Sequence, residues 1–340
     1  MKNLKLAAVC LSCLTMTGCS ALNFSVEGLI NAPKLTSEQS EIHQALIESV
    51  GSNITLKYPK NGEYRSAYVI ANIDDEPTDE AMVFYEYTSN GSEEDGLRVN
   101  ILDKDEDGKW YSVKELAGAG TDIDQVIISP MGSNNQTDVF VGYQNLTNDE
   151  KTMEIYSYTD GDFKRVALDT YSVLEPLDIN NDGYIELITI QRSTNNDTGA
   201  VTAKASMLNM KNNEITRGEN VDMCDNVTSY VSSKTGMLDS GRRAIFIDGL
   251  TADGKLQTEI IYYRYSGLQN PMQLRSEKLL PLCTRPAGYY SEDMDGDGDV
   301  EIPSTSPMVG YENAVADEML YMTCLLYTSP SPETLRHLVC

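Results

Sequence analysis

Residues 172–192, SVLEPLDINNDGYIELITIQR, show how this chain is built. Two apolar segments are joined by the nine-residue loop 178–186, DINNDGYIE. The loop 293–301, DMDGDGDVE, repeats the same pattern, D-x-[DN]-x-D-G-x-x-E. Val, Leu and Ile on both sides of turn-forming residues predict two β-strands connected by a short acidic loop.

Similar hairpins recur about every 50 residues, and such a period predicts a repeat architecture. One series consists of tight-turn dipeptides: Asp107/Gly108, Asp160/Gly161, Asn212/Asn213 and Ser266/Gly267. A second series consists of apolar segments that begin at Glu80, Asp138, Glu186, Arg243 and Glu301. In the clearest unit we predict strands at about 172–177, 185–192, 205–209 and 214–218.

Four antiparallel strands per repeat of this length are typical of a β-propeller blade. We therefore predict an all-β fold, a β-propeller of four-stranded antiparallel blades within residues 54–323. The units are about 64–120, 121–171, 172–223 and 224–280, followed by a partial fifth. Residues 54–59 could supply a closing strand for a missing last blade.

One helix is predicted before the repeats, at residues 36–51. Thr36 and Gln39 form a capping box at its start, and Gly51 ends it. Ile42, Ala45 and Leu46 follow at helical spacing.

Acidic loops followed by a Glu-Ile-Val-type strand, one per unit, resemble the FG-GAP/VCBS repeats of integrin-type β-propellers. The resemblance covers roughly residues 64–310, and the whole chain resembles repeat-bearing lipoproteins of clostridia-like bacteria. It implies a propeller fold but no particular activity. The acidic loop is lost before Asp138 and before Arg243, so no ion is expected in those units.

Both complete loops suit Ca²⁺, a hard cation that takes about six to eight oxygen ligands. The expected ligands of the first loop are Asp178, Asn180, Asp182, the carbonyl of Tyr184, and Glu186. Those of the second are Asp293, Asp295, Asp297, the carbonyl of Asp299, and Glu301. The alternative is an acidic turn held by Asx hydrogen bonds alone. Because clustered carboxylates repel one another, we favour Ca²⁺ with a structural role.

Two further acidic stretches depart from the pattern. Residues 103–108 lack the final glutamate and are predicted to be a solvated hairpin tip. Asn72, Asp74, Glu76 and Glu80 are in register with the ion loops, but Pro77 replaces the glycine, so this site is degenerate.

The N-terminus has the features of a lipoprotein signal peptide at residues 1–18. Lys2 and Lys5 precede a short apolar core, and the MTGC of residues 16–19 resembles a bacterial lipobox. We expect Cys19 to be lipidated and residues 19–35 to form a tether. The alternative is an ordinary secretory signal. Either places the protein outside the cytoplasm, and lipidation makes it a membrane-anchored lipoprotein of a bacterial cell envelope.

The C-terminal residues 324–340 resemble a translated sequencing-library adapter, and we interpret them as a non-native tail. The alternative is a natural Pro/Ser-rich tail. Among the seven cysteines, Cys224 and Cys283 remain as possible disulfide partners, with two buried thiols as the alternative.

Composition narrows the function. The net charge of −26 argues against nucleic-acid binding, because phosphates would be repelled. Outside the tail only His43 remains, too little for a His-rich zinc site or a Ser-His-Asp triad. We therefore predict a binding or scaffold module for a carbohydrate or protein ligand, without a visible catalytic constellation. The alternatives are a polysaccharide hydrolase or lyase that uses paired carboxylates, and a subunit of an envelope sensor complex.

Overall fold

The structure is a computed structural model of the 340-residue chain. It describes residues 35–74, 76–88, 96–130, 137–145, 150–195, 197–211, 214–218, 220–238, 241–274, 276–307 and 317–323. The predicted signal peptide, Cys19 and the tail 324–340 lie outside these residues. The chain divides into two compact units, 1–44 and 45–340, and all the strands belong to the second.

Within the second unit the described strands form five antiparallel sheets, here called the first to the fifth sheet. The first contains β1 (Ile54–Leu56), β2 (Tyr68–Ala71), β3 (Glu80–Tyr87), β4 (Leu97–Lys104) and β5 (Trp110–Ala117). The second contains β6 (Asp122–Pro130), β7 (Thr137–Gln144), β8 (Lys151–Thr159) and β9 (Asp162–Tyr171). The third contains β10 (Val173–Leu177), β11 (Glu186–Thr194), β12 (Val201–Lys211), β13 (Glu214–Arg217) and β14 (Val221–Asp222).

The fourth sheet contains β15 (Val227–Leu238), β16 (Arg242–Thr251), β17 (Lys255–Arg264), β18 (Gly267–Gln269) and β19 (Thr284–Pro286). The fifth contains β20 (Glu301–Pro307) and β21 (Asp317–Thr323). In the first four sheets, four strands pair in chain order, so the predicted all-β fold of four-stranded antiparallel units is confirmed. The partial fifth unit is also present as the hairpin β20–β21.

Three short strands depart from the simple pattern. Strand β14 pairs with β12 on the same side as β13, and β19 pairs with β17 on the same side as β18. Each is therefore a second segment of the fourth strand in its sheet. Strand β1 pairs with β3, with Ile54 opposite Tyr87, next to β2 in the first sheet. The expectation that residues 54–59 close a missing last blade was therefore wrong. Strand β3 is longer than β2, and β1 occupies the backbone hydrogen-bonding positions that β2 leaves open.

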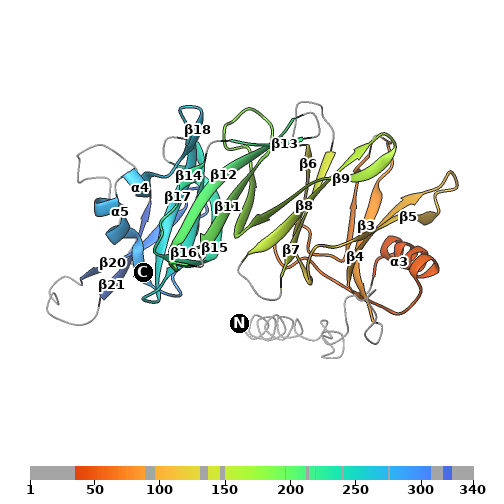
Figure 1. The fold of residues 1–340 in the computed structure, drawn as a ribbon, viewed down its shortest axis with the longest axis horizontal. Helices are drawn as coiled ribbons and strands as arrows, with labels where there is room; N and C mark the ends of the chain where they lie inside the picture. The colour runs from red at the N-terminus through yellow and green to blue at the C-terminus, as the bar shows by residue number, and fades with distance from the viewer. Residues whose placement is uncertain are drawn as a thin grey trace, which may run out of the picture. The chain divides into compact units, whose positions relative to one another are not determined.

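The sheets pack face to face in chain order (Figure 1). Alternate residues of a strand point to opposite faces of its sheet. In β7, Val139 and Val141 pack against the first sheet, whereas Phe140 packs against the third. In β16, Ile245 and Ile247 face the third sheet, and Phe246 faces the fifth. Because both faces are buried, these strands are continuously apolar rather than alternating.

Helix α3 (Ser37–Val50) was predicted from its capping box, which the structure contains. The backbone N–H of Gln39 donates to Thr36 Oγ1 and that of Thr36 to Gln39 Oε1, each at 3.1 Å. Two shorter helices, α4 (Pro271–Leu274) and α5 (Ser276–Cys283), are inserted between β18 and β19. None of the described helices is long and apolar enough to cross a bilayer.

Cys224 and Cys283 are both buried, and neither forms a disulfide. Of the two alternatives left open by the sequence, the structure contains the pair of free thiols. Burial raises the pKa of the Cys283 thiol to about 12, so this thiol is protonated and unreactive at neutral pH.

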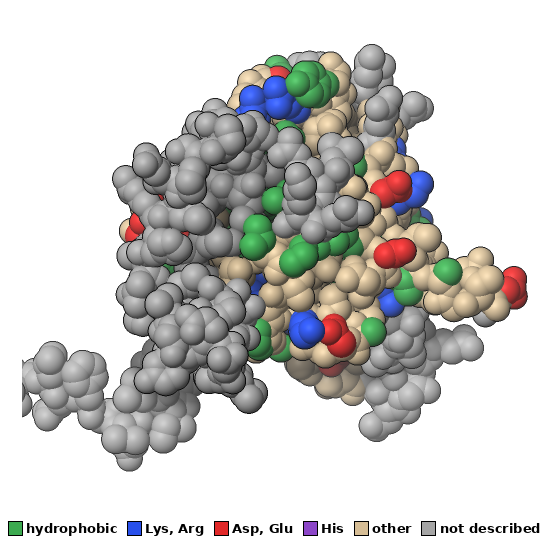
Figure 2. All heavy atoms as spheres, turned by 90° about the vertical axis from the view of Figure 1, so that its left-hand side faces the viewer, with side chains coloured by type: hydrophobic (Ala, Val, Ile, Leu, Met, Phe, Trp, Pro, Cys, Tyr) green, Lys and Arg blue, Asp and Glu red, His purple; other side chains and the backbone are tan. Residues whose placement is uncertain are grey.

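The surface around α5 and β20 shows hydrophobic, acidic and basic side chains (Figure 2). Hydrophobic side chains are exposed there among scattered acidic and basic ones. The exposed large hydrophobic residues of the last described segments include Leu282, Tyr289, Tyr290 and Met294.

Candidate functional site

The first predicted ion loop connects β10 to β11 and is closed by its own polar groups. Asn180 Nδ2 donates to Asp182 Oδ2 at 3.0 Å and to Glu186 Oε1 at 2.7 Å. Arg243, from the neighbouring strand β16, has its Nη1 3.1 Å from Asp178 Oδ2. An amide and a guanidinium thus compensate the carboxylates, and the three acidic side chains do not gather around one point.

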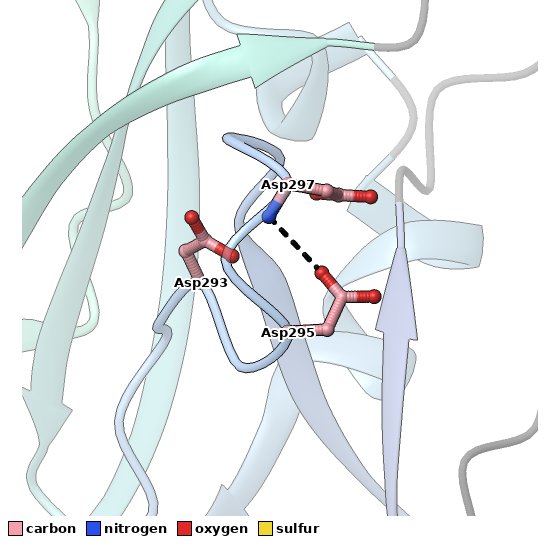
Figure 3. A group of neighbouring side chains, drawn as sticks. All are labelled: Asp293, Asp295 and Asp297. Carbon is pink, nitrogen blue, oxygen red and sulfur yellow. Dashed lines mark hydrogen bonds between the residues drawn. The ribbon is translucent and has the colours of Figure 1, made fainter.

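The second predicted ion loop precedes β20 and brings its aspartates together. Asp293, Asp295 and Asp297 each place a carboxylate oxygen within 4.8 Å of the others (Figure 3). Both oxygens of Asp293 accept backbone hydrogen bonds, at 2.7 Å from Gly296 and at 3.0 Å from Gly298. These glycines have φ angles of 78° and 94°, which L side chains rarely adopt. The loop thus brings three of its four predicted carboxylate ligands together, and Glu301 is not part of that cluster.

The residues expected to offer carbonyl oxygens take equivalent positions in the two loops. Tyr184 N donates to Asp182 Oδ1 at 2.9 Å, and Asp299 N donates to Asp297 Oδ1 at 2.9 Å. The backbone therefore makes the same Asx turn at the same place in both loops.

The glutamate at the end of the loop braces it from the following strand. Its Oε2 accepts a hydrogen bond from the backbone N–H at loop position 2 in three loops: Glu80 from Ile73, Glu186 from Ile179 and Glu301 from Met294, at 2.8, 3.1 and 2.8 Å. The other oxygen, Oε1, is buried without a hydrogen-bond partner in Glu80 and Glu301. Burial, together with the nearby carboxylates of Asp182 and Asp178, raises the pKa of Glu186 to about 7. The brace is present even in the degenerate loop that ends at Glu80.

The hairpin tip at residues 103–108 has the solvated turn that the sequence predicted. Asp105 Oδ1 accepts backbone hydrogen bonds from Asp107 at 3.0 Å and Lys109 at 2.9 Å. The turn connects β4 to β5 and contains no glutamate brace.

A cavity of about 580 Å³ lies where consecutive sheets bring their first strands together. Its walls are residues 124–128 of β6, 172–176 at β10, 230–234 of β15, and 61–65 before β2, with Lys151 added from β8. Its volume falls in the range of small-ligand sites, roughly 300–1,000 Å³.

Two β-bulges shape the cavity wall. The register of β6 on β7 skips Asp124, and that of β15 on β16 skips Val231. A bulge redirects the side chain of the extra residue and is enriched next to functional sites. Both bulge residues line the cavity.

Asp124 is held in the cavity wall by several polar contacts. It is buried and accepts hydrogen bonds from Asn61 Nδ2 at 2.8 Å and Tyr171 Oη at 2.6 Å, and Lys151 Nζ lies 2.9 Å away. Burial alone would raise the pKa of Asp124, but Lys151 and these donors outweigh it and lower the pKa. A Cβ at Gly142 would collide with the Tyr171 hydroxyl, so glycine is required there.

Glu175 in β10 also lines the cavity, as Glu63 does, and its pKa is shifted in the opposite direction from that of Asp124. Burial raises the pKa of Glu175, although a hydrogen bond from Ser233 Oγ opposes the shift. One cavity thus contains a stabilised carboxylate at Asp124 and a carboxyl that retains its proton more readily at Glu175.

Sequence reasoning missed this cavity because residues from four different units line it. A usable signal was present in the first strands, where polar residues interrupt apolar segments. Asp124 and Gln125 lie between Ile123 and Val126, and Glu175 follows Leu174.

No protein-family model matches the chain, and no curated protein matches it. Solved structures with some similarity include a putative 6-phosphogluconolactonase from Bacteroides fragilis, at 11% identity and a TM-score of 0.33, covering 79% of this chain and 77% of that one. Rhamnogalacturonan lyase YesW has 10% identity and a TM-score of 0.37, covering 79% and 66%.

A putative exo-β-1,3-galactanase from Bifidobacterium bifidum is similar at 12% identity and a TM-score of 0.27, covering 84% and 99%. These values are too low to transfer an activity.

Proposed function

We propose that this protein is a lipid-anchored, extracytoplasmic binding module of the β-propeller type that holds a polar ligand, in particular an oligosaccharide, in the 580 Å³ cavity. The main support for this proposal is the polar lining of the cavity. Charged, amide and hydroxyl groups line it, and Tyr64 and Tyr230 add two aromatic rings. Saccharides are recognised by such a mixture, because hydroxyl groups need hydrogen-bond partners and sugar faces pack on rings.

The FG-GAP/VCBS-type loops support the sheets in this proposal rather than bind the ligand. Ca²⁺ would be held by Asp293, Asp295, Asp297, the carbonyl of Asp299 and Glu301. The cluster of aspartate oxygens and the unpartnered Oε1 of Glu301 support this assignment. The first loop would hold the ion less tightly, because Arg243 already compensates Asp178. Lipidation at Cys19 would attach the module to the membrane.

A polysaccharide-active enzyme is the second candidate, and the carboxyl pair of the cavity favours it. Hydrolases use one ionised and one protonated carboxyl group. Asp124 and Glu175 have pKa values shifted in opposite directions within one cavity. Product analysis by mass spectrometry separates the candidates, because the binding module leaves an oligosaccharide intact.

A bulky residue inside the cavity should block ligand binding. Val231 is 45% exposed and lines the cavity. A glycan array should identify a bound oligosaccharide, and Val231→Trp should weaken its binding at least about tenfold, or 1.4 kcal/mol, by calorimetric titration.

Val113 provides the matched control. It is also an exposed bulge valine, on the outer strand β5, and it does not line the cavity. Val113→Trp should bind as the wild type does. If both variants bound the oligosaccharide equally well, the binding site would lie outside the cavity. If the array showed no saccharide ligand, the proposed function would be refuted.

A further inference from the structure

A smaller cavity of about 240 Å³ adjoins the larger one. The two share Lys151, Ser172 and Tyr230 in their walls. The smaller cavity adds Arg192 from β11 and two amide side chains, Gln144 and Asn145. Among the residues that the structure describes, no carboxyl group lines it. This composition is unusual in a chain with a net charge of −26.

Two polar atoms in this wall are buried without a hydrogen-bond partner. They are Arg192 Nε and the hydroxyl oxygen of Tyr230. A buried donor without a partner costs about 1–3 kcal/mol, so native proteins rarely leave one unmatched. Because both atoms have almost no accessible surface, an acceptor delivered by a ligand would remove this cost once the two side chains turn toward the cavity.

Arg192 supplies the positive charge that remains for a ligand. The Lys151 ammonium is already paired with Asp124 at 2.9 Å. For Arg192, no ion pair with another described residue is present, and Ser172 Oγ fixes its backbone by accepting the N–H at 3.3 Å. A guanidinium presents a planar fork of donors that matches a carboxylate or phosphate group.

Two buried acids lie behind this wall, Asp124 beside Lys151 and Glu259 near Tyr230. Burial, and after it the charge of Glu259 on β17, raises the pKa of the Tyr230 hydroxyl. Burial raises the pKa of Glu259 itself, and hydrogen bonds from Asn270 and Cys224 oppose this shift. Its Oε2 accepts hydrogen bonds from Asn270 Nδ2 at 2.8 Å and from the backbone of Cys224 at 2.9 Å.

We propose that the smaller cavity is an anion subsite, in which Arg192 and the Tyr230 hydroxyl bind an acidic group of a saccharide whose chain occupies the larger cavity. This inference rests on the proposed function. It narrows the ligand to saccharides with a carboxylate or a phosphate group. Arg192 pairs with the anion, and Tyr230 donates a hydrogen bond to it.

The test compares three forms of one oligosaccharide by calorimetric titration: a uronic-acid form, its carboxyl-reduced neutral form and a phosphorylated form. At least one acidic form should bind the wild-type chain about tenfold or more tightly than the neutral form. Which acidic form binds more tightly identifies the source of the anion. Raising the salt concentration should reduce the difference.

Arg192→Gln should abolish the preference for the acidic form and leave the neutral affinity within about twofold. Arg192→Lys should retain part of the preference, because it keeps the charge and loses the fork. Arg264→Gln is the matched control. Its guanidinium lies over the exposed Tyr265 ring, 4.5 Å from the centroid, and lines neither cavity. It should retain the full preference.

The outcomes separate the inference from the proposed function. Equal affinity of the wild type for neutral and acidic forms would overturn the anion subsite and leave the saccharide module intact. Binding of no form would overturn both. A preference that survives in Arg192→Gln, with an unchanged melting temperature, would also overturn the assignment to Arg192.

Discussion

Replacing Arg285 by methionine should lower the free energy of unfolding by about 3–5 kcal/mol. The Arg285 side chain is fully buried, and its Nη2 donates to Asp248 Oδ1 at 2.8 Å. Its Nε donates to the Tyr289 carbonyl at 2.5 Å, so it fastens the segment before the second ion loop to the fourth sheet. The substitution would leave the Asp248 carboxylate buried without its cation. Urea denaturation of the full chain measures the change.

An exposed ion pair provides the control for this prediction. Lys255 lies 2.9 Å from Asp253, and both side chains are more than half exposed. Lys255→Met should leave the stability almost unchanged, because water screens such a pair. Asp248→Asn should recover part of the loss in Arg285→Met, since it removes the buried charge. If Arg285→Met were as stable as Lys255→Met, the contacts of Arg285 with Asp248 and Tyr289 would not stabilise the fold.

Removing Ca²⁺ should lower the melting temperature of the wild-type chain by about 5 °C or more. A ligand present at about 100 times its dissociation constant stabilises the folded state by about 2.7 kcal/mol. The reason is the cluster of Asp293, Asp295 and Asp297, whose mutual repulsion a cation relieves. Thermal scans in excess Ca²⁺ and in chelator measure the difference.

Substitutions assign this effect to particular loops. Asp295→Asn should remove the larger part of the Ca²⁺-dependent increment. Asp182→Asn should remove less, because the Asn180 amide already bridges the acids of the first loop. Asp105→Asn in the hairpin tip should leave the increment unchanged. Equal melting temperatures in Ca²⁺ and chelator would contradict a structural ion.

Strand and turn patterns were sufficient to predict the repeated units. Asp160 and Gly161 have φ angles of 55° and 74°, as expected for the predicted tight turn. The turn predicted at Ser266/Gly267 was placed one residue too late. Tyr265 and Ser266 have the positive φ angles of 54° and 63°, and Gly267 begins β18. The glycine suggested the turn, but pairing of Arg264 with Gly267 leaves Tyr265 and Ser266 as its two residues.

The insertion α4–α5 and the cavity were beyond sequence reasoning for a different reason. Both depend on contacts between units rather than on patterns within one. Cys283 of α5 packs with Val300 and Ile302 beside the fifth sheet. Asp124 and Arg192 belong to different units, and only the face-to-face packing of the sheets brings their cavities together. The ion-loop residues were predictable because each set lies within nine consecutive residues.

A crystal structure of the chain with the oligosaccharide selected by the glycan array would show directly whether the two cavities bind it. Ligand density is expected between β6, β10 and β15, in contact with Lys151 and next to Glu175. An acidic group of the ligand should lie against Arg192. Ligand density confined to the outer strands, with both cavities filled only by water, would contradict ligand binding in these cavities.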